Sequence, residues 1–143
     1  RDRGQSLDRD SLTSIANDMK ASYGHDILAR RVWDKVTNDG IVHAVFDSVR
    51  HQDEVSFLQS NGVQFLGVDA PLELRYERIV LRKGATDQVD FTTFERQDRR
   101  ERFGESSGQH IQACFALCNT IIMNDGDTKL FHNDLQGWIN EYI

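Results

Sequence analysis

The alternation of short apolar runs with helical segments is the sequence feature that most constrains the fold. The runs cover residues 41–47, 63–69 and 120–123, and the first is a nearly continuous apolar stretch with β-branched side chains. Runs of this kind are typical of strands buried on both faces, as in parallel sheets. Because helical segments separate the runs, the pattern favours βαβ units. We therefore expect an α/β fold in three layers, a parallel sheet flanked by helices.

Apolar residues that recur every three or four positions predict the helices. Leu12, Ile15 and Met19 form one such stripe, and Gly24 is a natural stop for it. The expected helices cover about residues 12–23, 28–36, 52–60, 71–83, 91–103 and 109–118, and a last helix uses Phe131, Leu135, Trp138 and Tyr142. The polar segment 84–90 reads as a mobile loop. No repeat or linker interrupts the chain, so we expect a single domain over residues 1–143.

Charge and composition exclude several classes of function. The formal net charge is -6, whereas a general nucleic-acid binder usually carries a basic excess or stripe. A local cluster of arginines can still hold a phosphate within an acidic protein. The five histidines show no metal-ligand spacing, so a zinc site is not expected. The chain has no long apolar run, and we expect a cytoplasmic protein in a reducing compartment, without a membrane partner.

Polar residues follow each predicted strand, at the edge where open parallel sheets bind ligands. The three segments are 47–50, 69–71 and 124–126. Arg50 is the side chain of most interest, because a guanidinium at this edge can fork onto a phosphate or carboxylate. The alternative is a surface arginine paired with Asp53 or Glu54, which is the less specific and more common arrangement.

Arginines on two predicted helices form a second candidate site. Arg75, Arg78 and Arg82 share one side of the helix at 71–83, and Arg99 and Arg100 lie on the helix beyond the polar loop. Together these helices resemble a lid over about residues 78–102, which could close on a polyphosphate and neutralise developing charge. The alternative is an exposed charged helix, since acidic residues nearly balance the basic ones here.

Four motifs in this order resemble one family. They are Asp-Ser-Val-Arg at 47–50 followed by Glu-Val at 54–55, Val-Asp-Ala-Pro at 68–71 followed by Arg-Tyr-Glu-Arg-Ile at 75–79, Gln-Asp-Arg-Arg-Glu at 97–101, and Ile-Met-Asn-Asp-Gly at 122–126. The chain is similar in this respect to the P-loop nucleoside monophosphate kinase superfamily, in particular to its dephospho-coenzyme A kinase-like and adenylate kinase-like branch. The resemblance covers nearly the whole chain, although Ser48 replaces the usual glycine of the first motif.

The resemblance implies roles for particular residues. Substrate binding would fall to Lys20, Asp47 and Arg50, catalysis to Arg78, Arg82 and Arg100, and nucleotide binding to Asn124, Asp125 and Gly126. It also implies ATP and Mg²⁺ as cofactors, with no metal ligand identified in this chain. The expected partner is a small-molecule nucleotide, and fusion to, or assembly with, another nucleotide-metabolism domain is a further expectation.

One element of the family is absent from the sequence. The string Gly-x-x-x-x-Gly-Lys-Ser/Thr, whose backbone wraps the ATP phosphates, occurs nowhere in residues 1–143. We therefore expect either that a strand, loop and helix are missing upstream, or that the sheet has rearranged. The expected function is phosphoryl transfer from ATP to a nucleotide or a dephospho-coenzyme A-like acceptor, without turnover by this chain alone. The alternative is a non-catalytic nucleotide-binding or regulatory domain of degenerate kinase fold.

Overall fold

The computed structural model describes residues 9–82, 89–104 and 109–142. The chain forms two compact units, Arg1–Val63 and Gln64–Ile143, and each is described by itself. Whether a single domain spans both units stays a prediction. None of the helices within these described ranges has both the length and the apolar character that crossing a membrane requires.

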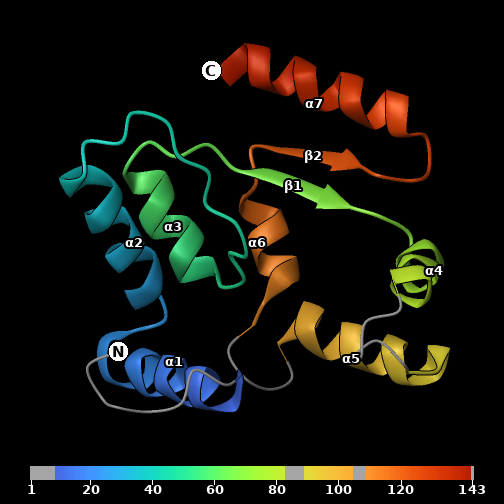
Figure 1. Ribbon diagram of the computed structural model, residues 1–143, viewed down its shortest axis with the longest axis horizontal. Helices are drawn as coiled ribbons and strands as arrows, with labels where there is room; N and C mark the ends of the chain where they lie inside the picture. The colour runs from blue at the N-terminus through green and yellow to red at the C-terminus, as the bar shows by residue number, and fades with distance from the viewer. Residues whose placement is uncertain (1–8, 83–88, 105–108, 143) are drawn as a thin grey trace. The chain divides into compact units, whose positions relative to one another are not determined.

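The first unit is built from helices α1 (Arg9–Tyr23), α2 (Ile27–Asn38) and α3 (Gln52–Ser60), shown in blue to green in Figure 1. α2 contacts both of the others. Ala29 of α2 and Val55 and Leu58 of α3 are buried, whereas Leu12 of the stripe predicted for α1 is exposed. The three helices confirm the prediction, and α3 confirms it at both ends.

The predicted strand at 41–47 is wrong, because the structure gives this segment no strand pairing. Val42 is 86% and Val45 95% exposed, and only Phe46 of the segment is half-buried, where its ring stacks on Trp33. A strand buried on both faces needs a neighbour along its edge and layers above and below it. No such neighbour is present for this segment in the described part of its unit, so apolar composition alone did not make it a strand.

The second unit contains the two strands found in the described residues. Its elements are β1 (Leu66–Asp69), α4 (Leu72–Arg82), α5 (Phe91–Phe103), α6 (Ile111–Leu117), β2 (Thr120–Met123) and α7 (Thr128–Tyr142). The strands pair in parallel, with Leu66 opposite Thr120 and Asp69 opposite Met123. The parallel pairing of these two predicted strands is thus confirmed, while the three-layer sheet as a whole stays a prediction.

Hydrogen bonds extend the pairing beyond both ends of the strands. Phe65 donates its N–H to the Asn119 side chain at 2.9 Å and accepts the Asn119 N–H at 3.0 Å. At the other end, Asn124 donates its N–H to the Asp69 carbonyl at 2.7 Å. Because the pairing is fixed at both ends, the residues that follow β1 and β2 are held side by side.

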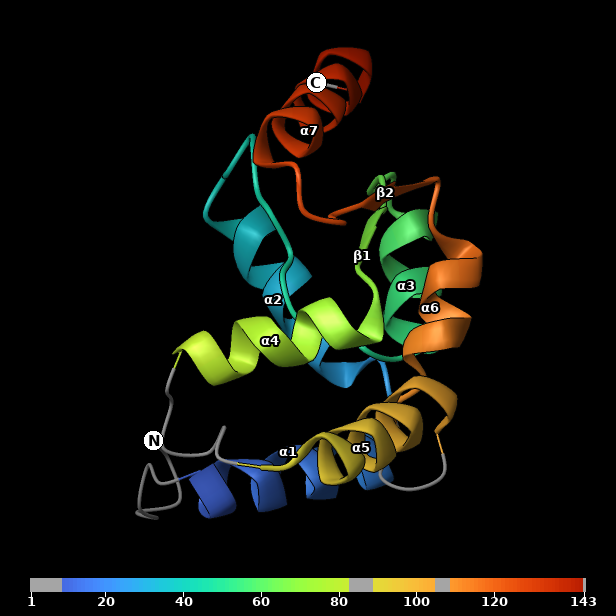
Figure 2. The same cartoon turned by 90° about the vertical axis from the view of Figure 1, so that its right-hand side faces the viewer.

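Helices cover the strand pair from more than one side. α7 lies next to β2 in Figure 1 and again in the turned view of Figure 2. α5 contacts both α4 and α6. Its N-terminus is capped by Asp90, whose carboxylate accepts the Thr93 N–H, and its C-terminus by Gly104, in the left-handed conformation that glycine favours. Most of the predicted loop at 84–90 lies outside the described residues.

Gly67 allows β1 to approach α6 closely. A β-carbon at this position would lie 2.8 Å from the Phe115 ring and 3.2 Å from the Ile121 side chain. The first distance requires the ring to shift, and the second is tighter than an ordinary carbon–carbon contact in a packed interior. A glycine at residue 67 is therefore required by space, not by backbone conformation.

We expect Gly67→Ala to lower the free energy of unfolding by about 1–3 kcal/mol, the usual effect of overpacking a filled site. The matched control is Gly137→Ala, within α7, where no atom lies within 4 Å of the added methyl group. Alanine should stabilise that helix by about 0.5–1 kcal/mol. Urea denaturation of both variants measures the difference, and equal effects would contradict the close approach at Gly67.

Candidate functional site

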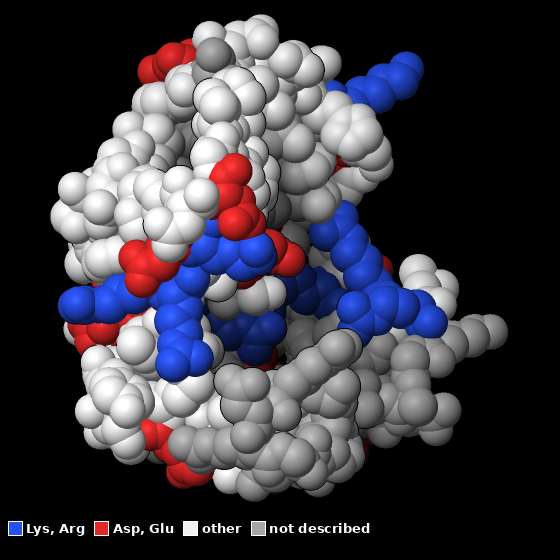
Figure 3. Space-filling view, turned by 60° about the vertical axis from the view of Figure 1, so that its left-hand side comes forward, with Lys and Arg blue, Asp and Glu red and all other residues white. Residues whose placement is uncertain are grey.

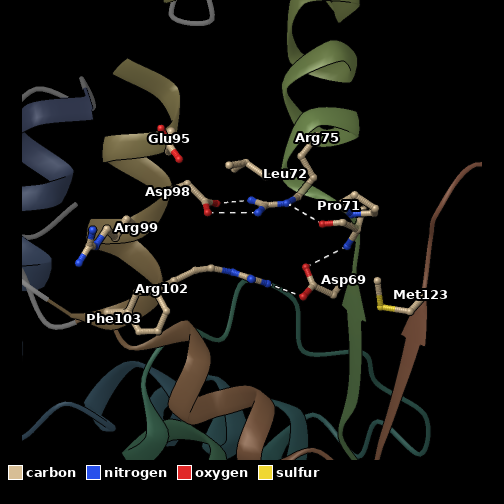
Figure 4. A pocket seen from close by; sticks show the side chains of 11 residues that line it. Asp69, Pro71, Leu72, Arg75, Glu95, Asp98, Arg99, Arg102, Phe103 and Met123 are labelled. Carbon is tan, nitrogen blue, oxygen red and sulfur yellow. Dashed lines mark hydrogen bonds and ion pairs between the residues drawn. The ribbon is translucent and has the colours of Figure 1, made fainter. Parts of the chain in front are cut away.

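The carboxyl ends of β1 and β2 lie at the same edge of the strand pair, because parallel strands point the same way. A cavity of about 780 Å³ opens at this edge (Figure 4). It is lined by Asp69, Ala70, Pro71, Leu72, Arg75, Glu95, Asp98, Arg99, Arg102, Phe103 and Met123. This volume is within the usual range for small-molecule sites. We call this cavity the β1 pocket.

Arg75, from α4, is held on one side of the β1 pocket by three hydrogen bonds. Its Nε donates to the Ala70 carbonyl at 2.9 Å, and its guanidinium forks onto the two oxygens of Asp98, with Nη2 to Oδ2 at 3.1 Å. The hydrogen bond that Arg75 donates to Asp98 raises the pKa of Arg75 above its ordinary value, against the opposing effect of burial. The pair links α4 to α5 and fixes the plane of the guanidinium.

Arg102, from α5, reaches the end of β1 and pairs with Asp69 (Figure 4). The same carboxylate accepts the Ala70 N–H at 2.9 Å through its other oxygen. The guanidinium also lies 5.6 Å from the centre of the Phe115 ring, within the range of a cation–π contact. Arg75 and Arg102 are therefore each oriented by a carboxylate before any ligand arrives.

Arg78, also from α4, binds the residue that follows β2. Arg78 donates from Nη1 to the Asn124 carbonyl at 3.0 Å and from Nη2 to the Asn124 side-chain oxygen at 2.9 Å. The structure thus brings together two residues that the sequence predicted for different roles. Their roles in catalysis and nucleotide binding stay predictions.

Other predicted residues lie apart from the β1 pocket. Arg82 and Arg100 do not line it, and Asp125 lines a second cavity, of about 620 Å³, between β2 and α7. Gly126 has a φ of +132°, as a turn glycine can. The predicted lid corresponds to α4 and α5, which the Arg75–Asp98 pair joins, and its closure stays a prediction.

Sequence reasoning missed Asp98 and Arg102 as members of this site. A signal was present, since residues four apart share one face of a helix. Asp98 and Arg102 therefore face the same way from α5, and each meets a partner of opposite charge on another element. The sequence does not show that both partners meet α5 at the carboxyl end of β1. Asp69 is the last residue of that strand, and Arg75 binds the carbonyl of the next residue, Ala70.

The remaining predicted residues belong to the first unit. Asp47 accepts the Ser48 N–H at 2.6 Å, and Ser48 has a φ of +65°, a conformation that favours glycine. The predicted side-chain pairing of Arg50 with Asp53 or Glu54 is not among the ion pairs of the described residues. Instead the buried carboxylate of Glu54 accepts the backbone N–H groups of Arg50 and His51, both at 3.1 Å.

His51 connects this segment to the end of α1. Its ring stacks on that of His25, with 4.1 Å between centroids and 12° between planes. Its Nδ1 accepts the Asp53 N–H at 3.2 Å and so caps α3. Burial lowers the pKa of His51, and the nearby charges of His25 and Lys20 lower it further, although Asp53 and Glu54 act in the opposite direction.

In Figure 3 several acidic side chains lie next to basic ones, and most of the other described atoms in this view belong to uncharged residues. Within the first unit, Arg30 pairs with Asp26 and Lys35 with Asp39. Arg75 and Arg102 of the β1 pocket have carboxylate partners as well. Acidic neighbours thus offset much of the positive charge, in keeping with the net charge of -6.

Comparison with known proteins places the chain beside one group of archaeal proteins. It is 28% identical to a UPF0200 protein of Methanosarcina acetivorans, over 99% of the chain and 74% of the relative. It is 31% identical to a UPF0200/UPF0201 protein of Archaeoglobus fulgidus, over 90% of the chain and 40% of the relative. A UPF0200 protein of Sulfurisphaera tokodaii is also 31% identical, over 84% of the chain and 64% of the relative.

These comparisons correct the resemblance drawn from the sequence motifs. The relatives carry UPF0200 and UPF0201 names, and none of those given is named a kinase. No family model matches the chain, and no solved structure matches it. Assignment to the P-loop nucleoside monophosphate kinase superfamily, and to its dephospho-coenzyme A kinase-like branch, is therefore wrong. The four motifs are short, and together they do not establish membership of that superfamily.

The cap formed by His51 makes the stability of the first unit depend on pH. The folded state lowers the pKa of His51, so the unfolded chain binds a proton more readily than the folded one. The stabilisation that neutral His51 contributes is fully present above its pKa in the unfolded chain, about 6.5. It is lost as the pH falls through that pKa towards the lower pKa of the folded state.

We expect the thermal midpoint to fall between pH 7 and pH 5, and to fall less in His51→Asn, because asparagine also caps helices but does not titrate in this range. The matched control is His43→Asn, at an exposed position of the same unit. Circular dichroism melts at each pH measure the midpoint. If the slope with pH is unchanged in His51→Asn, this account is wrong.

Proposed function

We propose that the β1 pocket binds a phosphorylated small molecule, and that a nucleotide is the ligand class that fits it best. The main observation in support is that Arg75 and Arg102 come from two helices and that a carboxylate orients each of them towards the carboxyl end of β1. Guanidinium groups held in this way lose little conformational freedom when they bind an oxyanion.

The rest of the lining supports a ligand with both charged and flat apolar parts. Leu72, Phe103 and Met123 supply apolar surface beside the arginines (Figure 4). α4 begins at Leu72, and the N–H groups of a first helical turn have no partner within the helix and attract anions. A phosphate would meet these donors and the unused N–H groups of Arg102, while a base or similar ring would contact the apolar side chains.

The residues of the pocket do not fit a magnesium site by themselves. Mg²⁺ usually takes one or two carboxylates together with substrate phosphates. Asp69 and Asp98 already accept hydrogen bonds from Arg102 and Arg75, which leaves Glu95 as the one other carboxylate among the described residues of the pocket lining.

Phosphoryl transfer from ATP to a nucleotide or dephospho-coenzyme A-like acceptor is a second proposal. The observation that favours it is the Arg78 fork on Asn124, which adds a further guanidinium beyond the end of β2. Several arginines at one edge can neutralise the charge that develops on a transferred phosphoryl group. Non-catalytic binding of the nucleotide needs only Arg75 and Arg102.

Calorimetric titration of the chain with ATP, ADP, AMP and dephospho-coenzyme A tests the binding proposal. We expect at least one to bind, and Arg102→Gln to weaken it about tenfold or more, since a hydrogen bond to a charged group contributes about 1.5–3 kcal/mol. The double variant Asp69→Asn with Arg102→Gln should bind as weakly without leaving Asp69 unpaired, so it separates binding from stability.

The matched control is Arg96→Gln, an exposed arginine of α5 outside the pocket lining. It should bind the nucleotide as the unchanged chain does. Equal weakening in Arg96→Gln and Arg102→Gln, or no binding of any of the four compounds, would refute the proposal. Formation of ADP with a phosphorylated acceptor would support the transfer reaction in addition.

A further inference from the structure

We propose that the groove between β2 and α7 binds a linear aliphatic polyamine, with its methylene chain on an apolar floor and its ammonium groups at carboxylates along the rim. This groove is the second cavity, of about 620 Å³. α7 returns along β2 in the opposite direction, so the groove runs lengthwise between strand and helix (Figure 1). The site does not rest on the β1 pocket or on the function proposed for it.

The first argument is the shape of the groove. Its lining includes all four residues of β2 and one face of α7, where the lining positions recur every three or four residues from Leu130 to Glu141. Gly137 lies within this face, and a β-carbon there would have no atom within 4 Å. A glycine inside a helix is destabilising relative to alanine, and no close contact requires one here. The missing side chain does leave the groove open to a ligand.

The second argument is the apolar floor of the groove. Ile121 and Met123 of β2 are 49% and 47% exposed, and Leu130 of α7 is 60% exposed, although all three line the groove. Trp138 lines it as well, and the face of an aromatic ring attracts an ammonium group. A chain of methylene groups that ends in an ammonium group can cover apolar surface while its charge stays at the rim, as lysine side chains do.

The third argument is the charge along the groove. Asp125, Asp134 and Glu141 line it, whereas its described lining contains no lysine, arginine or histidine. None of these carboxylates takes part in an ion pair with another described residue. Negative charges along one groove repel one another, and a cation between them removes that repulsion. A positively charged ligand therefore complements the groove.

The position of Glu141 is independent support for a cationic ligand. It lies in the last turn of α7, which contains no basic residue. The C-terminus of a helix carries partial negative charge, so cations are favoured there and carboxylates are not. An ammonium group at Glu141 would also meet backbone carbonyl groups of the last turn, which have no partner within the helix.

The spacing of the carboxylates favours an extended cation over a metal ion. Asp134 and Glu141 are seven residues apart on α7, which is about 10 Å along the helix axis. Within the described part of the chain, no three histidine, cysteine, aspartate or glutamate side chains form a group that could hold a metal ion. A polyamine such as spermidine separates its ammonium groups by chains of methylene groups, so it can meet carboxylates that lie this far apart.

The test is a fluorescence titration of the Trp33→Phe variant with spermidine at low ionic strength, because Trp138 is then the only tryptophan of the chain. We expect the emission of Trp138 to change and to saturate. The affinity should fall as sodium chloride is added, since salt screens exposed charges. Butylamine, which has one ammonium group, should bind about fivefold or more weakly than spermidine. Magnesium chloride at equal ionic strength should leave the emission unchanged.

Asp134→Asn and Glu141→Gln should each weaken spermidine binding about fivefold, as expected for loss of one exposed ion pair. The matched control is Glu77→Gln, at an exposed position of α4 outside the groove. Gly137→Leu should abolish binding because its side chain fills the groove, while the thermal midpoint stays the same or rises. Its control is Gln136→Leu, at an exposed position of α7 outside the lining, which should bind spermidine normally.

The proposal is overturned if spermidine does not change the emission of Trp138, if butylamine or magnesium binds as tightly as spermidine, or if Gly137→Leu binds spermidine normally. Tetralysine forms the second arm, and tighter binding of this peptide than of spermidine would overturn the assignment to a free polyamine in favour of a basic protein segment. Arg102→Gln should bind spermidine normally, so failure of this proposal and failure of the nucleotide proposal are distinguishable.

Discussion

The parallel pairing of β1 with β2 is the constraint on which the second unit depends. It joins segments far apart in the sequence, and bonds from Asn119 and Asn124 hold it at both ends. Since the strands run the same way, the residues after each strand meet at one edge. Asp69 and Asn124 then serve as fixed acceptors for arginines from α4 and α5. The charged edge is thus a consequence of strand direction, not of any single motif.

Local sequence signals predicted the helices well. α3 and α5 were predicted with the bounds that the structure gives, and each has a clear cap, the His51–Glu54 pair for α3 and Asp90 for α5. These signals lie within a few residues of the helix ends, so they can be read from the chain alone. The segment 41–47 shows the opposite case. Its apolar residues predicted a buried strand, but burial depends on what lies beside a segment, which its own composition does not contain.

The candidate sites were predictable only in part, and for a similar reason. Arg75 and Arg78 were recognised from their spacing on one helix, whereas their partners Asp98 and Asn124 come from other elements. The stack of His25 on His51 could not be foreseen, because neither residue forms a motif with its sequence neighbours. The family resemblance did not predict these contacts either. It assigned Arg78 to catalysis and Asn124 to nucleotide binding, although the two residues are hydrogen-bonded to each other.

The contact between Gly67 and Phe115 has a consequence for how this sequence can change over time. A larger side chain at position 67 fits only if a smaller residue has replaced Phe115. A smaller residue at position 115 leaves a void as long as position 67 is glycine. Neither step is neutral alone. Substitutions at these two positions should therefore appear together among descendants, as a correlated pair that reports the packing of a strand on a helix.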